Sequence, residues 1–304
     1  MFFNCSNLTY INFDKLNLTN VKFMISMFEG CTSLKELRIS CYNINSYKRI
    51  LTTLIYHYFI RYDLNPKSVI NLENTFYGCN SLVSLDISNW NLENVNNMKN
   101  TFAYCKHLKT IKFPSFNCHN LKNIAYLFSN CESLESIDLN QFQNTYNIVN
   151  MSHMFENCFS IKELDLPNFN ITSVQDIQFM FAGCKNLTRV LFNNTNKNQI
   201  ENMNSLFYNC FSFYNFNLGV FNTEKVIDMS RMFYNCSSIR GMGLYSYDTS
   251  KVKYMDEMFY GCTSLKKLYI PNFVGDSLIS SKDIFKNTNI SELSATQSFL
   301  NKLN

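Results

Sequence analysis

The sequence lacks several features that would place it in a common class of protein. No stretch approaches the roughly 18 consecutive apolar residues of a membrane-spanning helix. The stretch from Met1 to Asn20 shows no basic region followed by an apolar run, the pattern that marks a secretory signal. Charged residues make up only 16% of the 304 residues and the net charge is +4. No block of Lys and Arg occurs, so nucleic-acid binding is not indicated.

Catalytic motifs are missing as well. The chain contains no glycine-rich phosphate loop, no G-x-S-x-G elbow and no H-E-x-x-H motif. Asp and Glu are scattered along the sequence and are not paired as an acid and a base. We therefore expect no enzyme and no cofactor.

Glycine and proline are scarce, with 8 and 4 residues, whereas phenylalanine (28) and tyrosine (18) are abundant. Apolar residues make up 46% of the chain, which is enough for an extensive core and excludes a disordered chain.

Ten of the twelve cysteines recur at a regular spacing, which indicates a repeat array. Eight of the nine intervals are 26 or 27 residues, and the interval from Cys31 to Cys79 is 48, one repeat with an insertion. Phe stands three residues before each of the ten, and an eleventh copy begins at Phe285 with Thr288 in place of Cys. The ten cysteines are Cys5, Cys31, Cys79, Cys105, Cys131, Cys158, Cys184, Cys210, Cys236 and Cys262.

Each repeat predicts one short strand and one short helix. Apolar residues three, six and eight positions after Cys end in an alternation that predicts a half-buried strand. Upstream, "NMSHMF" at 150–155 and "DMSRMF" at 228–233 place apolar residues at i, i+3 and i+4, the spacing of one helix face. Asn150 and Asp228 then stand where an N-cap side chain accepts a free backbone amide.

The residue just before each cysteine is Gly or Asn in nine of the ten repeats, with Tyr104 the exception. Gly and Asn tolerate a positive φ and commonly end helices. We expect this position to turn the chain from the helix into the strand.

The fold predicted from these elements is α/β, a leucine-rich-repeat-like solenoid of about 10–11 coils in which one period of the cysteines makes one coil. Residues 1–304 form one domain, with a helical insertion at 43–64 in a return loop and a degenerate last repeat or C-terminal cap at 285–304. The apolar stripe of the insertion is expected to pack on the solenoid, and a docking helix is the alternative. A column of Asn twelve residues after Cys predicts either a hydrogen-bonded ladder at a coil corner or a solvated loop.

The repeat resembles that of the BspA-like leucine-rich repeat proteins, as in "VKYMDEMFYGCTSLKKLYI" at 252–270. The resemblance covers nearly the whole chain. It implies a leucine-rich-repeat solenoid with a role in adhesion or partner binding at a cell surface, and it brings no catalytic residues. The chain departs from secreted members of that family because it shows neither a signal peptide nor a lipobox.

Twelve cysteines and four histidines also raise the question of a metal site. Cys105, His107, Cys118 and His119 have the residue types of a zinc site, but Cys105 belongs to the repeat frame. We expect the repeat cysteines to be small buried thiols and predict no metal site.

A partner is expected on the outward strand positions, five and seven residues after Cys, and at their edge. Asp138, Glu163 and Asp165 form a small acidic patch near the middle of the array. Toward the C-terminus the face becomes uncharged and aromatic, and we expect repeats 7 to 10 to be the main protein-binding surface. The residues of this second zone are Leu191, Tyr214, Asn215, Asn217, Gly241, Gly243, Tyr245 and Tyr269.

Three functions remain open from the sequence: a surface or secreted adhesion module, an intracellular protein-interaction scaffold, and a purely structural array. Met1 and Phe2 occupy the frame positions of Met258 and Phe259, so the sequence opens inside a repeat. A signal upstream of Met1 would favour the cell surface, and its absence the cytoplasm. The uncapped first coil leaves oligomerisation through that coil open.

Overall fold

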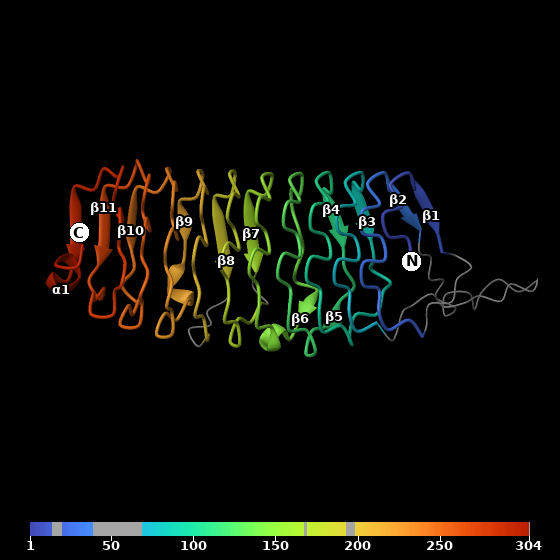
Figure 1. The fold of residues 1–304 in the computed structure, drawn as a ribbon, viewed down its shortest axis with the longest axis horizontal. Coiled ribbons are helices and arrows are strands. Elements are labelled where there is room, and N and C mark those ends of the chain that lie inside the picture. Colours follow the sequence, from blue (N-terminus) through green and yellow to red (C-terminus); the bar gives the residue numbers. More distant parts are fainter. Residues whose placement is uncertain (14–19, 39–68, 167–168, 193–197, 304) are drawn as a thin grey trace, which may run out of the picture.

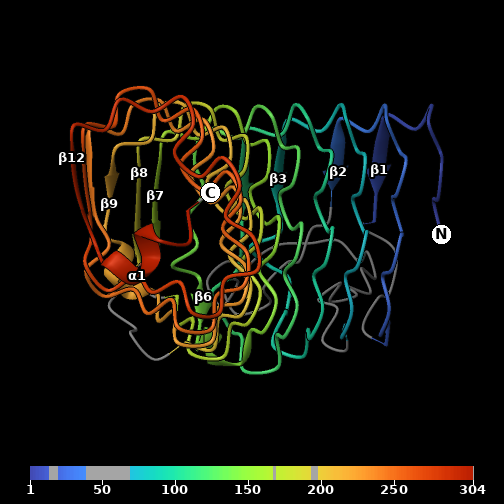
Figure 2. The same cartoon turned by 60° about the vertical axis from the view of Figure 1, so that its left-hand side comes forward.

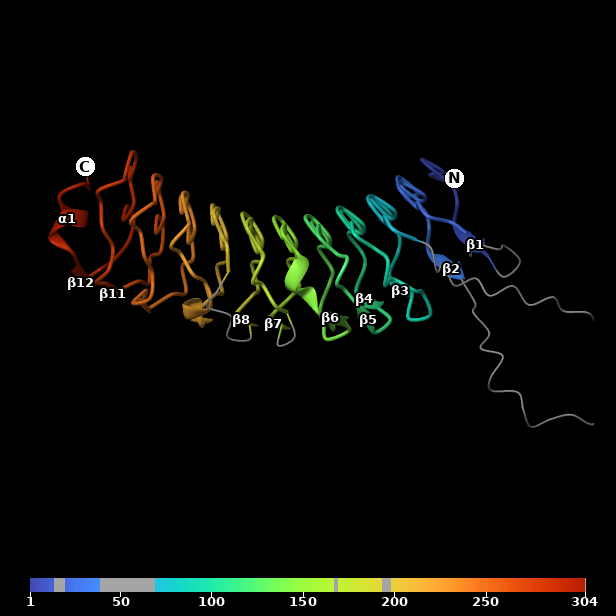
Figure 3. The same cartoon turned by 90° about the horizontal axis from the view of Figure 1, so that it is seen from below.

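The structure is a parallel β-solenoid of about nine complete coils, fewer than the 10–11 predicted, and each coil corresponds to one repeat of the sequence. It is a computed structural model, and it describes residues 1–13, 20–38, 69–166, 169–192 and 198–303. We number the coils 1 to 10 by their repeat cysteines, from Cys5 to Cys262. Figure 1 shows the coils side by side in sequence order, and Figure 3 shows that the row is gently curved.

One strand per coil builds the first wall of the solenoid, and every pairing between neighbouring strands is parallel. In the described part of coil 5 this wall carries no strand, and the ladder divides into short sheets. The strands of this wall are β1 (Tyr10–Asn12), β2 (Glu36–Arg38), β3 (Ser84–Asp86), β4 (Thr110–Lys112), β7 (Glu163–Leu166), β8 (Arg189–Phe192), β9 (Asn215–Phe216), β10 (Gly241–Gly243), β11 (Lys267–Ile270) and β12 (Glu292–Ala295).

The return side of the coils contains shorter elements. Strands β5 (Phe116–Asn117) and β6 (Phe142–Gln143) pair with each other, and the 3₁₀ turns η2 (Thr145–Asn147) and η3 (Leu218–Val220) lie in coils 5 and 8. After β12 the chain forms helix α1 (Gln297–Leu300), which buries Phe299 against the ring of Phe273. The predicted insertion at 43–64 lies outside the described residues.

The strand prediction is confirmed in every coil except coil 5. Strands β1, β3, β4 and β10 each bury their middle residue and expose the two beside it. In β3, for example, Leu85 points into the core while Ser84 and Asp86 point outward. Pro114 and Pro271 follow the ends of β4 and β11, where no further ladder hydrogen bond is needed.

The predicted helix in each coil is wrong. Among the described residues the segment before each cysteine is a run of turns, and α1 is the only α-helix. The backbone takes a positive φ twice in each turn segment, five residues and one residue before Cys. In coil 6 these residues are His153 (φ 57°) and Asn157 (φ 58°). A helix cannot contain two such residues, because every residue within it needs a negative φ.

This alternation directs amides out of the coil and toward the next one. In coil 6 the N–H groups of Met151, His153, Phe155 and Asn157 donate to carbonyls of coil 7 at 3.0, 2.9, 2.9 and 2.7 Å. An α-helix would keep those amides within its own segment. The i, i+3, i+4 spacing of apolar residues is therefore real, but the hydrogen bonds join neighbouring coils. Seen from the C-terminal end in Figure 2, these turn segments form the wall opposite the strands.

The Asn and Asp side chains at the start of each turn segment accept a backbone amide, as predicted, although no helix follows. Asn150 Oδ1 accepts from the N–H of Ser152 at 2.9 Å, and Asp228 Oδ1 from the N–H of Ser230 at 2.7 Å. The same bond forms at Asn71, Asn97, Asn123, Asp176 and Asn202.

The positive φ predicted just before Cys is confirmed for Gly, for Asn and for Tyr104. Gly183 shows why glycine occupies some of these positions. A Cβ there would lie 2.2 Å from Oδ1 of Asn157 in the preceding coil, whereas at Gly78 the nearest atom is 3.9 Å away. Glycine at residue 183 thus leaves room for the asparagine of its neighbour.

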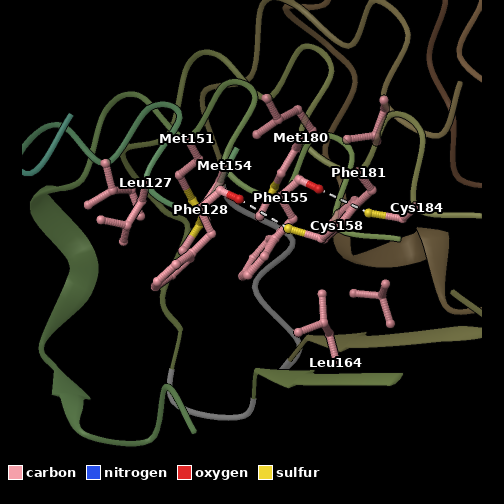
Figure 4. Close-up of a cluster of buried hydrophobic side chains, with 14 of the residues drawn as sticks. Leu127, Phe128, Met151, Met154, Phe155, Cys158, Leu164, Met180, Phe181 and Cys184 are labelled. Carbon is pink, nitrogen blue, oxygen red and sulfur yellow. Dashed lines mark hydrogen bonds between the residues drawn. The ribbon is translucent and has the colours of Figure 1, made fainter. Parts of the chain in front are cut away.

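Stacked columns of identical positions build the core. The rings of the Phe column lie parallel with centroids 5.3 to 5.9 Å apart from Phe2 to Phe285. The repeat cysteines from Cys31 to Cys262 are fully buried beside them, as predicted, whereas Cys5 in the first coil is exposed, contrary to the prediction. Figure 4 shows the thiols of Cys158 and Cys184, which donate to the carbonyls of Phe128 and Phe155 at 3.1 and 3.0 Å.

A second aromatic column, eleven residues after Cys, is absent from the sequence-based prediction. All of its described members are buried, and all but two are Phe. The column consists of Trp90, Phe116, Phe142, Phe169, Phe221, Tyr247 and Phe273. Two of these residues carry a polar atom, and neither Trp90 Nε1 nor the Tyr247 hydroxyl has a hydrogen-bond partner among the described residues.

We expect Tyr247→Phe to raise the free energy of unfolding. The substitution removes an unpartnered buried hydroxyl and restores the residue that most of this column contains. The expected gain is about 1 kcal/mol, measured by urea unfolding. The reverse change in the preceding coil, Phe221→Tyr, is the matched control and should lower the stability. A less stable Tyr247→Phe protein would contradict this account.

The cysteine column predicts a steep loss of stability at alkaline pH. Burial raises the pKa of Cys184 and Cys262 to about 12, and it raises the pKa of Cys105, Cys158, Cys210 and Cys236 well above the ordinary value. A thiol whose pKa is raised by folding makes its full contribution to the free energy of unfolding below its unfolded pKa, which is about 8.5 for Cys. That contribution is lost as the pH rises toward the folded value. In this window each thiol should lower the free energy of unfolding by about 1.4 kcal/mol per pH unit.

Urea unfolding from pH 8 to 10.5 measures this slope. Cys184→Ala removes one titrating thiol and should make the slope shallower by about 1.4 kcal/mol per pH unit, although the cavity lowers stability at every pH. An unchanged slope in Cys184→Ala would show that the thiol does not titrate on unfolding.

Candidate functional site

The outward strand face carries the residues that the sequence singled out. Positions five and seven residues after Cys alternate with the buried position between them, so their side chains point away from the core. The parallel register stacks equivalent positions of neighbouring coils: Glu163 lies beside Arg189, and Gly243 beside Tyr269. The face is therefore a set of straight rows that run along the solenoid axis.

The predicted acidic patch is partly neutralised by its neighbours. The Arg189 guanidinium donates to the carboxylate of Glu163 and forms an ion pair with it. The Asp138 carboxylate accepts the backbone N–H of Asn140 at 2.9 Å and the side-chain amide of Gln141 at 3.4 Å. Asp165 is exposed on the next coil. Two of the three carboxylates thus have partners within the chain.

The C-terminal zone brings aromatic side chains together. Tyr214 and Tyr245 are 62% and 60% exposed, and the ring of Tyr245 stacks on that of Tyr269 with 6.1 Å between centroids. The Tyr269 hydroxyl donates to Glu292, which also forms an ion pair with Lys267 at 3.0 Å. Hydrogen bonding to Glu292 raises the pKa of Tyr269, so its hydroxyl keeps its proton.

The two glycines of β10 differ in their surroundings. A Cβ on Gly243 would lie 2.3 Å from Cε2 of Tyr245, because that ring folds over the glycine. A Cβ on Gly241 would meet only Lys267, at 3.7 Å, which is an ordinary contact. Gly243 thus makes room for a ring of this chain. At Gly241 the strand face lacks a side chain beside Lys267, and we call this position the notch.

The remaining predicted residues lie at the edge of this zone. Leu191 is half-buried in β8. Asn217 accepts the backbone N–H of Gly219 at 3.3 Å and so begins η3. Asn215 lies in β9, in register with Arg189.

Sequence reasoning missed the charge of this zone. Arg240 and Lys266 stand just before β10 and β11, both are exposed, and the N–H of Lys266 donates to the carbonyl of Arg240 at 2.9 Å. Neither side chain forms an ion pair with a described residue. In the earlier coils Lys106, Lys109 and Lys112 pair with carboxylates of a neighbouring coil at 3.1, 3.2 and 3.5 Å. The signal was present in the sequence, four residues after Cys, in a column that the strand pattern did not include.

The turn wall carries aromatic stacks that the sequence-based prediction also lacks. Tyr208, Tyr234 and Tyr260 stack with 4.8 Å between centroids, and all three are half-buried. Farther along the wall His153 is stacked between the rings of Tyr126 and Phe179, at 4.2 and 4.8 Å. These rings mainly cover each other, so they present less free surface than the tyrosines of the strand face.

The four residues that resemble a zinc site lie in separate places. Cys105 donates to the carbonyl of Phe76 inside the core, and His107 Nδ1 lies 2.7 Å from the carbonyl of Asn80 on a turn. Cys118 is buried, whereas His119 contacts Asn120 at an exposed corner. Within the described ranges no three Cys, His, Asp or Glu side chains are grouped as metal ligands would be.

The Asn column at the coil corner is hydrogen-bonded to its own backbone. Asn91, Asn117, Asn170, Asn222 and Asp248 each accept the amide two residues on, at 2.8 to 3.1 Å. Asn17 and Asn196 lie outside the described residues. These side chains fix the corner of the coil and leave the strand face as the candidate binding surface.

The family of the chain follows from its repeats. A family model described as "Mycoplasma protein of unknown function, DUF285" matches residues 1–57, 70–194 and 188–297, which is most of the sequence. The chain belongs to this family. None of the curated proteins compared with this DUF285 chain matches it.

Solved structures similar to this DUF285 protein are leucine-rich repeat proteins. A leucine-rich repeat protein from Bacteroides ovatus is 19% identical with a TM-score of 0.43, over 95% of this chain and 79% of that one. A leucine-rich cell surface protein from Faecalibacterium prausnitzii is 17% identical with a TM-score of 0.40, over 99% and 77%. A Treponema pallidum (T. pallidum) protein is 22% identical with a TM-score of 0.39, over 65% and 72%.

A search of the described segments for a membrane-crossing helix finds none that is long and apolar enough.

The different surroundings of the two glycines in β10 give opposite predictions. Gly241→Ala should raise the free energy of unfolding by about 0.5 kcal/mol, because alanine loses less backbone entropy on folding. Gly243→Ala should lower it, because the new methyl group displaces the Tyr245 ring. Urea unfolding measures both.

A double variant, Gly243→Ala with Tyr245→Ala, is the control for the ring. In a protein that already carries Tyr245→Ala, adding Gly243→Ala should not lower the free energy of unfolding, because the ring that the methyl group would displace is absent. Equal effects of alanine at residues 241 and 243 would show that the ring does not rest on Gly243.

Proposed function

We propose that this DUF285 chain is a non-catalytic binding module for adhesion, which holds a protein partner on its strand face. The main contact is made by coils 7 to 10. The observation that carries the proposal is the exposure of Tyr214 and Tyr245 on this wall. Tyrosine offers a large contact area with little conformational entropy to lose on binding, and exposed aromatic groups on a rigid array are typical of binding surfaces.

Rigidity favours the same role. The strand face rests on a core of stacked rings and on turn segments whose amides bind the next coil. Side chains on such a wall keep their spacing, so a partner meets a preorganised surface and little ordering cost arises on binding. The resemblance to BspA-like repeats supports an adhesive role at a cell surface.

The acidic residues Asp138, Glu163 and Asp165 belong to the proposal as a secondary contact. Glu163 is already paired with Arg189, and Asp138 is bound to its own turn. A partner would have to replace those contacts, so we assign the tyrosine zone the larger share of the binding energy.

Site-specific photo-crosslinking tests the proposal in cells that express the protein. A photoreactive phenylalanine derivative replaces Tyr245 on the strand face and, as the matched control, Tyr254 on the turn wall, where the side chain is also exposed. We expect a discrete protein adduct from residue 245 and none from residue 254.

Absence of an adduct at residue 245 would refute the proposal, and so would the same adduct from both residues. In the first case the strand face has no partner, and in the second the crosslinks report random encounter. Circular dichroism of both variants verifies that the solenoid is intact.

A further inference from the structure

The charge of the strand face is unevenly distributed. In coils 4 to 7 Lys109, Lys112 and Arg189 each pair with a carboxylate of a neighbouring coil. Lys162 in coil 6 is exposed and forms no ion pair with a described residue. In coils 9 and 10 and β12, the wall has Arg240, Lys266 and Lys267 against the single carboxylate of Glu292. That carboxylate is already shared by Lys267 and Tyr269.

Two cations of coils 9 and 10 therefore remain without a carboxylate among the described residues, and they are neighbours. The backbone hydrogen bond from Lys266 to Arg240 places them in adjacent coils, one above the other. Strands in adjacent coils lie about 4.8 Å apart. Like charges on adjacent strands repel each other weakly in water, and a carboxylate bound beside both would be attracted to each of them.

The notch at Gly241 lies directly beside these two cations. Gly241 follows Arg240 in the sequence and is in register with Lys267, the residue after Lys266. With no side chain at residue 241, the backbone of β10 is open between the two rows. A side chain of a partner can approach there, and the positive charges of Arg240 and Lys266 favour a side chain that is negatively charged.

Aromatic residues border the same area. Tyr214 occupies the same repeat position as Arg240, four residues after Cys, one coil earlier. The stacked rings of Tyr245 and Tyr269 lie toward the C-terminal ends of β10 and β11. The cations and the notch are thus bordered by apolar ring surface, which would exclude water around a bound segment.

We propose that coils 8 to 10 bind an acidic segment of a partner protein, with a carboxylate side chain at the Gly241 notch between Arg240 and Lys266. This inference rests on the proposed function and specifies the chemistry of the partner. The tyrosines supply contact area, and the cations supply selectivity and faster association.

The test uses the whole chain and a synthetic peptide of alternating glutamate and serine. About ten residues, roughly 33 Å when extended, are enough to cross coils 8 to 10 in either direction. Binding is measured by fluorescence anisotropy at several salt concentrations. We expect binding that weakens as salt is added, because exposed charges are screened.

Two pairs of variants locate the site. The double variant Arg240→Gln with Lys266→Gln should weaken peptide binding about tenfold. Its control is Lys162→Gln, which replaces an exposed lysine at the same repeat position in coil 6 and should leave peptide binding unchanged. Gly241→Val should weaken binding by filling the notch. Ser136→Val at the equivalent position of coil 5 is its control. Urea unfolding verifies that each variant is folded.

The outcomes separate this inference from the proposed function. A loss of binding free energy from Lys162→Gln that is about half the loss from Arg240→Gln with Lys266→Gln would overturn the inference, since binding would then follow net charge alone. Binding of a heparin fragment but not of the peptide would also overturn it, in favour of a sulfated polysaccharide. If a partner is crosslinked at residue 245 but the peptide does not bind, the acidic segment is refuted and the proposed binding function stands. If neither crosslinking nor peptide binding is observed, both proposals are refuted.

Discussion

Backbone hydrogen bonds from each turn segment to the next coil are the interaction on which the rest of the structure depends. Four alternate amides of a segment donate to the following coil, as those of Met151, His153, Phe155 and Asn157 do. This geometry requires two residues of positive φ in every coil, a conformation that is normally unfavourable outside glycine. The cost is offset because each of these amides finds a carbonyl partner in the next coil, so that every coil is bonded to its neighbour.

The core follows from this constraint. Once the turn segments are fixed at one spacing, equivalent side chains must stack on one another, and planar rings stack well at the observed 5.3 to 5.9 Å. A cysteine beside each ring is small enough for the crowded corner, and its thiol donates to the carbonyl of the Phe in the preceding coil, as Cys158 does to Phe128. The rigid outer wall is a consequence of this inner order, and it is what gives the tyrosines and cations of coils 8 to 10 fixed positions.

Much of the fold could be predicted from the sequence, and the exceptions have physical reasons. The strands were found because alternation has a period of two and Leu85 with its neighbours shows it directly. The turn at Cys−1 was found because Gly and Asn identify a positive φ. The second positive-φ position was missed because Ser26, Phe179 and Arg231 give no such signal, and only the next coil makes that conformation favourable. The helix was therefore predicted where a run of turns exists.

The candidate site likewise has features that the sequence predicts and features that it does not. The outward positions of Tyr214, Tyr245 and Tyr269 followed from the repeat frame, whereas the ring of Tyr245 over Gly243 and the pairing of Glu163 with Arg189 required the packing of side chains in space. Local periodicity in the sequence is enough to establish the repeat, most of its strands and the face that each residue occupies. Which amides bind which coil, and which charges remain unpaired, depends on contacts between coils that are a full repeat apart in the chain, so these features are visible only in the folded protein.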